Sequence, residues 1–289
     1  MKLSHLYSQV VKFGIKNDPR RHESIKGFED SAILFGDPQT EVKKVLVGID
    51  IEVGELLLAD RIRSKEGLDL VISHHPEGHA YASLYKVMRV QIDLLEQAGI
   101  SRKVATELLE ERQREVERRI LPNNHSRAVD AARLLKMPFM CMHTPADNHV
   151  YAYLKNLFAK EKPKTVKDIL DILMTIPEYK LAAEAKVGPR SILGSPKREV
   201  GKILIEMTGG TEGSKDVYDK IYKTGVRTLV SMHLSEDHFK KVKEANLNVI
   251  IAGHISSDTL GLNLLLDNIE SEEKLHVFDC SGFRRVKRN

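Results

Sequence analysis

The sequence predicts an α/β protein with mostly parallel sheets flanked by helices. Short apolar runs alternate along the chain with amphipathic helical patterns, which is typical of strand–helix–strand units. Runs such as "LVI" in 70–72 and "VII" in 249–251 lack polar alternation and fit strands buried on both faces. The composition, 42% hydrophobic and 30% charged, is that of a globular protein, and 289 residues suffice for one large domain or two lobes.

The expected strands cover 43–51, 68–75, 138–143, 201–207, 227–233, 247–254 and 274–280. Apolar residues at helical spacing indicate helices between them, around 94–98, 104–120, 217–222 and 239–245. Two stretches look like additions to this core. One is the charged helix at 101–125, and the other is 155–200, where a helix at 165–175 is followed by Pro and Gly punctuation typical of loops or a hairpin.

Charge and cysteine content argue against several classes of partner. The formal charge of +4 is mild, and basic residues alternate with acidic ones, so we do not expect a nucleic-acid interface. Cys141 and Cys280 lie in apolar runs, as expected of buried thiols in a reducing compartment. We expect no signal peptide and no membrane partner, and therefore a cytoplasmic protein.

Five histidines lie at or just beyond the carboxyl ends of predicted strands: His74, His75, His143, His233 and His254. Ligands and reactions collect at this edge of open parallel sheets. A single histidine there is most simply a structural residue, but four strands delivering imidazoles to one edge favour a site. Neutral imidazole is a good ligand for zinc, iron, manganese or nickel, so the set indicates a metal site.

Carboxylates occur at informative spacings from these histidines. Asp147 follows His143 by four residues, and Asp258 follows His254 by four. If a helix begins near 256, His254 and Asp258 can converge on one point. The alternative for Asp258 is simple compensation of charge at a helix N-terminus.

The adjacent pair His74–His75 adds a geometric constraint. Neighbouring side chains on an extended strand point to opposite faces, so the two imidazoles are suited to two ions, or to one ion and a substrate. Pro76 then ends the strand. With carboxylates able to bridge, the pattern suggests a two-metal centre of the kind used in hydrolysis.

The segments "LDLVISHHPEGH", "HTPAD", "MTGG" and "VIIAGHISSD" together resemble the Nif-three-like family, over 43–265. Its members are dinuclear-metal proteins often described as GTP cyclohydrolase type-I-like. The resemblance implies two α/β lobes with a metal cleft between them, and a homo-oligomeric ring, commonly a hexamer. We expect 1–130 plus 247–289 in the first lobe and 131–246 in the second. The implied metal ligands are His74, His75, Asp147, His254 and Asp258, the last where the family usually has glutamate.

Further residues are candidates for contact with substrate. His79 is a candidate proton carrier or phosphate contact, and the alternative is an exposed loop histidine. His143 and His149 flank Asp147; one is expected to face substrate while the other orients the carboxylate. His143 is also a candidate proton carrier. The remaining expected substrate contacts are Thr144, His149, His233, and Gly209 and Gly210 of the glycine-rich turn 207–216, whose N–H groups could hold an anion.

The expected function is therefore metal-assisted hydrolysis with two divalent ions, and with His79 or His143 moving a proton. The substrate would be a small molecule: a nucleotide-like compound, a phosphoester or a cyclic amide. The alternative is a metal-binding protein without catalysis, such as a metal chaperone or a scaffold.

Overall fold

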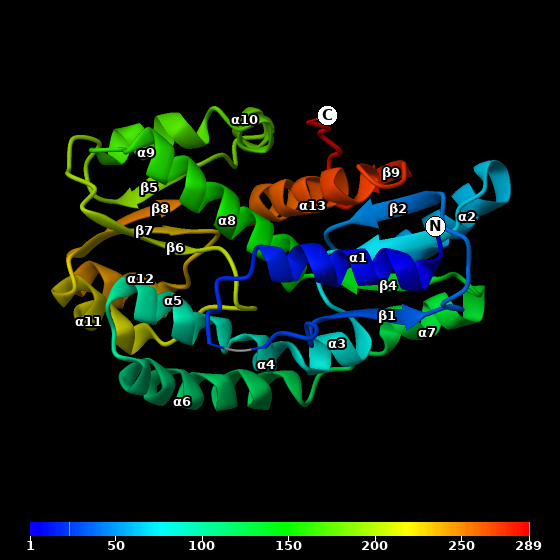
Figure 1. Cartoon of the computed structure of the whole chain (residues 1–289), viewed down its shortest axis with the longest axis horizontal. Helices are drawn as coiled ribbons and strands as arrows, with labels where there is room; N and C mark the ends of the chain where they lie inside the picture. Colours follow the sequence, from blue (N-terminus) through cyan, green and yellow to red (C-terminus); the bar gives the residue numbers. More distant parts are fainter. Residues whose placement is uncertain (23, 289) are drawn as a thin grey trace.

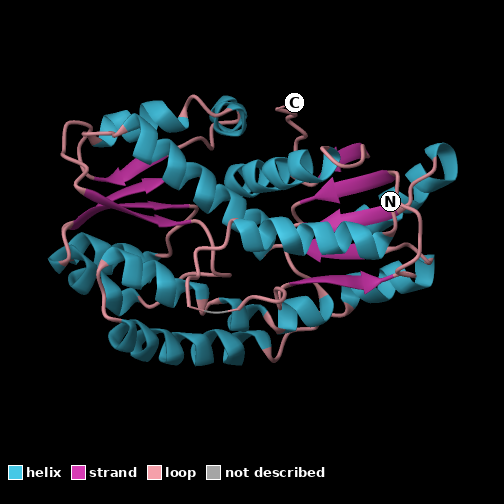
Figure 2. Ribbon diagram, viewed as in Figure 1, coloured by secondary structure: helices cyan, strands magenta, loops and turns pink. Residues whose placement is uncertain are grey.

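The computed structural model describes residues 1–22 and 24–288 and contains two β-sheets with helices on their faces (Figure 1; Figure 2). The first sheet has the order β1-β4-β3-β2-β9, and the second has the order β5-β8-β7-β6. In each sheet one edge strand is antiparallel and the other pairings are parallel. The predicted α/β class with mostly parallel sheets is confirmed.

All seven predicted strands are present: β2 (Lys44–Gly48), β3 (Leu70–Ser73), β4 (Phe139–Met142), β6 (Lys202–Glu206), β7 (Val226–Ser231), β8 (Asn248–Ile251) and β9 (His276–Cys280). Two strands were not predicted, β1 (Ser31–Phe35) and β5 (Arg190–Leu193). Both are the antiparallel edge strands. β5 alternates exposed and half-buried residues, so it lacks the continuous apolar run by which the other strands were recognised.

The helices cover the sheets on both faces (Figure 2). They are α1 (Leu3–Lys16), α2 (Val53–Glu66), α3 (Gly78–Ala82), α4 (Leu84–Val87), α5 (Val90–Ala98), α6 (Arg102–Ile120), α7 (Arg127–Leu135), α8 (Thr144–Glu161), α9 (Val166–Leu173), α10 (Pro177–Glu184), α11 (Tyr218–Lys223), α12 (Glu236–Glu244) and α13 (His254–Glu270), with a 3₁₀ turn at Lys215–Val217.

The two stretches that looked like additions both fold onto the second sheet. The charged stretch forms α6, whose buried side chains Ala105, Leu109 and Val116 share a core with β6 and β7. The stretch 155–200 contains the end of α8, then α9, α10 and β5. Cys141 and Cys280 are both free thiols. Within the described part of the chain, no helix combines the length and apolar character needed to span a bilayer.

The sheets do not follow the expected lobe boundaries. β4 lies in the first sheet between β1 and β3, although 131–246 was assigned to the second lobe. β8 lies in the second sheet between β5 and β7, although 247–289 was assigned to the first. The chain crosses between the sheets inside two long helices, α8 and α13, and an uninterrupted helix carries no sequence signal of such a crossing.

These two helices lie side by side between the sheets (Figure 1). On α8, Ala146 belongs to the core of the first sheet, whereas Val150 and Leu154 belong to that of the second. On α13, Leu260 packs in the second core and Leu262 in the first. The helices therefore join the two sheets, and their first turns lie at the junction.

Candidate metal centre

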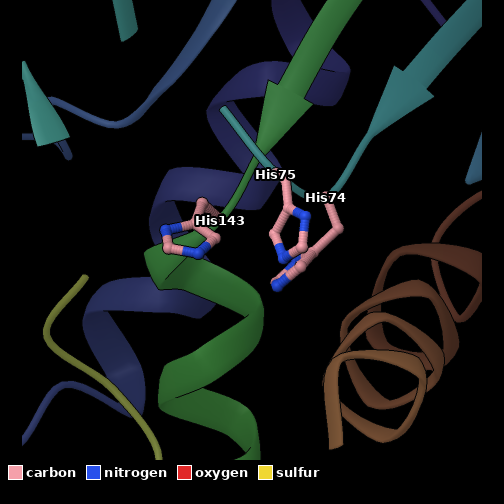
Figure 3. Close-up of side chains that lie close together, drawn as sticks. All are labelled: His74, His75 and His143. Atoms are coloured by element: carbon pink, nitrogen blue, oxygen red, sulfur yellow. The ribbon is translucent and has the colours of Figure 1, made fainter. Parts of the chain in front are cut away.

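Four of the five strand-end histidines come together in one cluster, and the fifth lies beside it. The ring centroids of His74 and His143 are 4.9 Å apart, those of His74 and His75 are 5.3 Å apart, and those of His75 and His254 are 5.2 Å apart. Figure 3 shows His74 and His75 directly after β3 and His143 between β4 and α8, with the rings facing a common space. The ring of His233 lies 5.0 Å from that of His254.

Local backbone geometry brings the carboxylates to the same point. Gly253 has a φ of 108°, a backbone conformation that glycine adopts without steric cost. This residue therefore lets the chain turn from β8 into α13. His254 is then the first residue of α13, and Asp258 lies one turn later on the same face. His143 occupies the N-cap position of α8, directly before the helix, and precedes Asp147 by one turn.

Asp258 stands between two sets of ligand atoms. Its Oδ1 is 3.5 Å from His74 Nε2, which is itself 3.4 Å from Asp147 Oδ1. Its Oδ2 is 3.5 Å from His75 Nε2 and 3.6 Å from His254 Nε2. The first ligand set is therefore His74, Asp147 and Asp258 Oδ1, and the second is His75, His254 and Asp258 Oδ2. The tandem histidines thus approach one carboxylate from two sides.

The polar atoms of this cluster fit a bound cation. Both nitrogens of His74, Asp147 Oδ1 and both oxygens of Asp258 are buried and have no hydrogen-bond partner in the described structure. Buried polar atoms are normally paired, so unpaired ones need an explanation. In each ligand set the three donor atoms lie within 4.8 Å of one another. Nitrogen and carboxylate donors at this spacing suit a divalent transition metal.

The electrostatics agree with this interpretation. Burial opposes a charge on His74, but the carboxylates of Asp258 and Asp147 outweigh it and raise the pKa of His74 to about 10. For His75 burial is likewise outweighed, by the carboxylates of Asp258 and Asp50, and its pKa rises to about 9. The site therefore attracts positive charge, which a proton or a metal ion can supply.

Two carboxylates outside the ligand sets orient the imidazoles. Asp50 Oδ1 is 2.7 Å from His75 Nδ1, which leaves Nε2 directed at Asp258. Asp30 Oδ2 is 2.7 Å from His143 Nδ1 and also accepts a hydrogen bond from the Thr144 hydroxyl at 2.6 Å. Carboxylates that hold the second imidazole nitrogen in this way are typical of metal sites.

Two cavities meet at the cluster. The outer cavity, about 590 Å³, is lined by residues of the first sheet's loops, including Asp50, His75, Glu77 and Arg127. The inner cavity is smaller, about 80 Å³, and is lined by Asp147, Asp258 and residues of the second sheet. His143, His233 and His254 line both. A small molecule could therefore approach the cluster from one cavity and extend into the other.

Some predicted substrate contacts line these cavities. Gly210 lines both cavities, and its neighbour Gly209 uses its carbonyl to accept a hydrogen bond from Gln91 at 2.9 Å. His233 lies after β7 and its Nδ1 is 3.7 Å from Glu212 Oε1. The nearby carboxylate of Glu212 raises the pKa of His233.

Other predicted substrate contacts lie elsewhere. His79 is exposed on α3 and lines neither cavity. His149 is buried, with Nδ1 2.7 Å from the Pro145 carbonyl and Nε2 3.3 Å from Asn268 Nδ2. It follows Asp147 by two residues, about 200° around the helix, so it faces away from the cluster. The Thr144 hydroxyl donates a hydrogen bond to Asp30, the carboxylate that orients His143.

Sequence reasoning missed four carboxylates near the cluster. Asp50 and Glu206 lie at the ends of β2 and β6, so the strand-end rule that found the histidines could also have found them. Glu212 lies in the glycine-rich turn and lines the inner cavity. Asp30 precedes β1, an edge strand that was not predicted, and it lies 113 residues before His143 in sequence.

Comparison with known proteins gives a family. No family model and no curated protein matches this sequence. Among solved structures, a NIF3 superfamily protein from Sphaerobacter thermophilus matches with a TM-score of 0.80 and 30% identity, over 95% of this chain and 98% of that one. Reduced HcgD from Methanocaldococcus jannaschii matches with a TM-score of 0.58 and 15% identity, over 96% of this chain and 97% of that one.

A Bacillus cereus protein related to NIF3 has the same fold, with a TM-score of 0.51 and 10% identity over 100% of this chain and 98% of that one. At these lower identities HcgD and the Bacillus protein support the fold alone. The Sphaerobacter protein is similar enough, over nearly the whole of both chains, to assign the family as well as the fold. The chain belongs to the NIF3 superfamily.

Proposed function

We propose that this protein binds two divalent metal ions, one in each ligand set, and uses them for hydrolysis. The observation that carries the proposal is the position of Asp258, whose two oxygens face different pairs of protein ligands. A carboxylate so placed can bridge two ions. Aspartate is shorter than the family's usual glutamate, but it would still reach both ions. The reason is that α13 begins at His254 and brings the carboxylate of Asp258 within 3.6 Å of the imidazoles of His74, His75 and His254.

Zinc, iron, manganese or nickel bound there would supply Lewis acidity and lower the pKa of a coordinated water. The protein supplies orientation and a path for the proton. Asp30 fixes the Nδ1 side of His143, so that Nε2 faces the cavities and can accept a proton there. His79 is exposed outside both cavities, so we assign this role to His143.

Metal analysis tests the binding step. Protein purified without chelator, or reconstituted, is expected to hold two ions per chain by inductively coupled plasma mass spectrometry. His75→Ala and Asp147→Ala should each lower the stoichiometry, and Asp258→Ala should lower it most because it belongs to both sets. His79→Ala is the matched control and should retain both ions. A wild-type protein that takes up no transition metal would contradict the proposal.

An activity screen tests the catalytic step. We propose a small substrate that is nucleotide-like, a phosphoester or a cyclic amide, as in GTP cyclohydrolase-like chemistry. Metal-loaded protein is assayed with GTP, model phosphoesters and cyclic amides as substrates. The His143→Gln variant is expected to turn over substrate more slowly while keeping its metal. If the loaded protein turns over none of them, the result favours the second candidate, a metal chaperone or scaffold. An observation in its favour is that His143, the residue assigned to move the proton, also belongs to a group of three histidines that could hold an ion.

We also propose a homo-oligomeric ring, a hexamer, in the cytoplasm. The two free cysteines suit a reducing compartment. Exposed apolar side chains on α2 and α7, among them Leu57 and Leu134, offer surface that an assembly could cover. Multi-angle light scattering on the purified protein measures the mass directly, and a monomer at micromolar concentration would contradict the ring.

A further inference from the structure

Glu206 is a carboxyl without a partner on the wall of the inner cavity. It is the last residue of β6, and its side chain shares a face of that strand with Leu204, which also lines the cavity. Within the described residues, its carboxyl makes no hydrogen bond and no ion pair. Glu206 is half-buried, and a carboxyl in such a position without a partner loses part of its hydration, which is costly for its charged form.

The surroundings of Glu206 make a negative charge on its carboxyl unfavourable. Apolar side chains of Leu95, Leu204 and Val217 line the cavity around it. Burial, helped by the negative charge of Glu212, raises the pKa of Glu206 to about 7. None of the described residues that line this cavity is a lysine or an arginine. The basic side chain that acts on Glu206 is His233, which partly opposes the rise of its pKa, and His233 also interacts with Glu212.

The neighbouring Glu212 differs in this respect. Its Oε1 accepts a hydrogen bond from the Ser235 backbone N–H at 2.5 Å and lies 3.7 Å from His233 Nδ1. These interactions satisfy Glu212 within the fold and hold its pKa low, at about 2, even though burial alone would raise it. Apart from Asp147 and Asp258 of the candidate metal centre, Glu206 is thus the carboxyl of this cavity that is left to interact with a ligand.

The cavity also limits the shape of that ligand. It runs from Glu206 to Asp147, His254 and Asp258 of the metal centre, and its 80 Å³ compare with 590 Å³ for the outer cavity. A small group fits such a space beside the apolar side chains, and one end of the same molecule would then reach the residues of the candidate metal centre. Glu206 belongs to none of the three-residue groups that could hold an ion, so a second metal site there is not indicated.

We propose that Glu206 recognises the substrate by accepting hydrogen bonds from two N–H groups of a flat amidine-type group. Such a group presents parallel N–H bonds that match the two oxygens of a carboxylate, and its planar body can pack between Leu95, Leu204 and Val217. The substrate class is then a nitrogen heterocycle or amidine with adjacent N–H groups. The end of the substrate away from Glu206 would lie at the candidate metal centre. Only for that end does the inference rest on the proposed hydrolysis.

Benzamidine is a suitable probe, and benzamide is its uncharged counterpart of the same shape. Calorimetric titration of the full-length protein should show binding of benzamidine and at least tenfold weaker binding of benzamide. Glu206→Gln keeps the shape of the side chain and should weaken benzamidine binding about tenfold or more, since a charge-assisted pair is lost. Glu184→Gln, at an exposed glutamate on α10, is the matched control and should bind as the wild type does.

Two further readouts separate recognition from a structural role and from the metal chemistry. Unliganded Glu206→Gln should melt at the same temperature as the wild type or higher, and should hold the same amount of metal. Equal benzamidine affinity in wild type and Glu206→Gln, or a marked loss of stability in the variant, would overturn the assignment. Metal-free protein that binds benzamidine in a Glu206-dependent way would support it even if no hydrolysis is found.

Discussion

The imidazoles of the candidate metal centre are oriented by carboxylates that lie outside both ligand sets. Asp30 is fully buried and contacts His143 Nδ1, the Thr144 hydroxyl and the Thr144 N–H. Burial raises its pKa, but the hydrogen bond with His143 and those with Thr144 outweigh burial and lower it overall. Asp30 is therefore a buried carboxylate kept ionised by the residues that it positions.

Asp30→Asn tests this positioning role. The amide has the same shape but no charge and a single acceptor oxygen, so we expect a loss of about 1.5–3 kcal/mol in unfolding free energy. Turnover should also fall, while metal content stays near the wild-type value because Asp30 belongs to neither ligand set. Urea unfolding measures the first effect, with the exposed Asp219→Asn as control. A variant as stable and active as the wild type would contradict the role.

His149 supplies a pH-dependent contribution to stability. Burial lowers its pKa to about 4, against an ordinary value of 6.5. Between these values the unfolded chain binds more protons than the folded one, so stability falls as pH falls through that window. The expected loss is about 3 kcal/mol between pH 6.5 and 4. His149→Asn keeps a donor for the Pro145 carbonyl and should lose less stability over this range, as measured by denaturant unfolding at several pH values.

The sequence located the histidines that cluster in the fold because strand ends carry a strong signal. His74, His75, His143 and His254 each follow an apolar run, and the parallel sheets bring those ends together. Asp30 gave no such signal, since its strand is an edge strand of mixed burial. His149 was misleading because spacing along the chain does not show which face of a helix is turned to the site.

At the scale of elements, the geometry of the candidate metal centre depends on how closely α8 approaches α13. A Cβ on Gly261 would lie 2.5 Å from the Ala146 carbonyl oxygen, so the helices can cross at this distance only with glycine. Ala146 precedes Asp147, and Gly261 lies three residues after Asp258. The crossing therefore sets the separation between the two carboxylates of the first ligand set.

Gly261→Ala should move the helices apart. The expected cost is about 1–3 kcal/mol of stability, as for an overpacked core, together with weaker metal binding because Asp147 and Asp258 separate. Thermal unfolding and metal titration measure the two effects. Gly54→Ala on α2 is the control, since a Cβ there meets nothing within 4 Å and alanine favours a helix. Unchanged metal affinity in Gly261→Ala would show that the crossing does not set the ligand geometry.

The whole molecule is organised around the same junction. α8 and α13 each contribute side chains to the cores of both sheets, so neither sheet has a complete core without them. The C-terminal segment adds to this connection, as Arg288 Nη2 lies 2.6 Å from the buried Glu178 of α10, and Arg285 pairs with Asp267 of α13. The fold is therefore expected to unfold as one cooperative unit even though it has two sheets.

Metal binding should then stabilise both sheets together. The first ligand set takes His74 from a loop of the first sheet and Asp147 and Asp258 from the two joining helices, so bound metal links all three. At a free metal concentration 100 times the dissociation constant, the gain is about 2.7 kcal/mol per site, or about 5 °C or more in melting temperature. Calorimetry should show a single transition that moves upward with metal. Asp258→Asn should abolish the shift, and His79→Ala should retain it. Two separate transitions, of which metal moves only one, would mean that the sheets unfold independently and that the helices do not couple them.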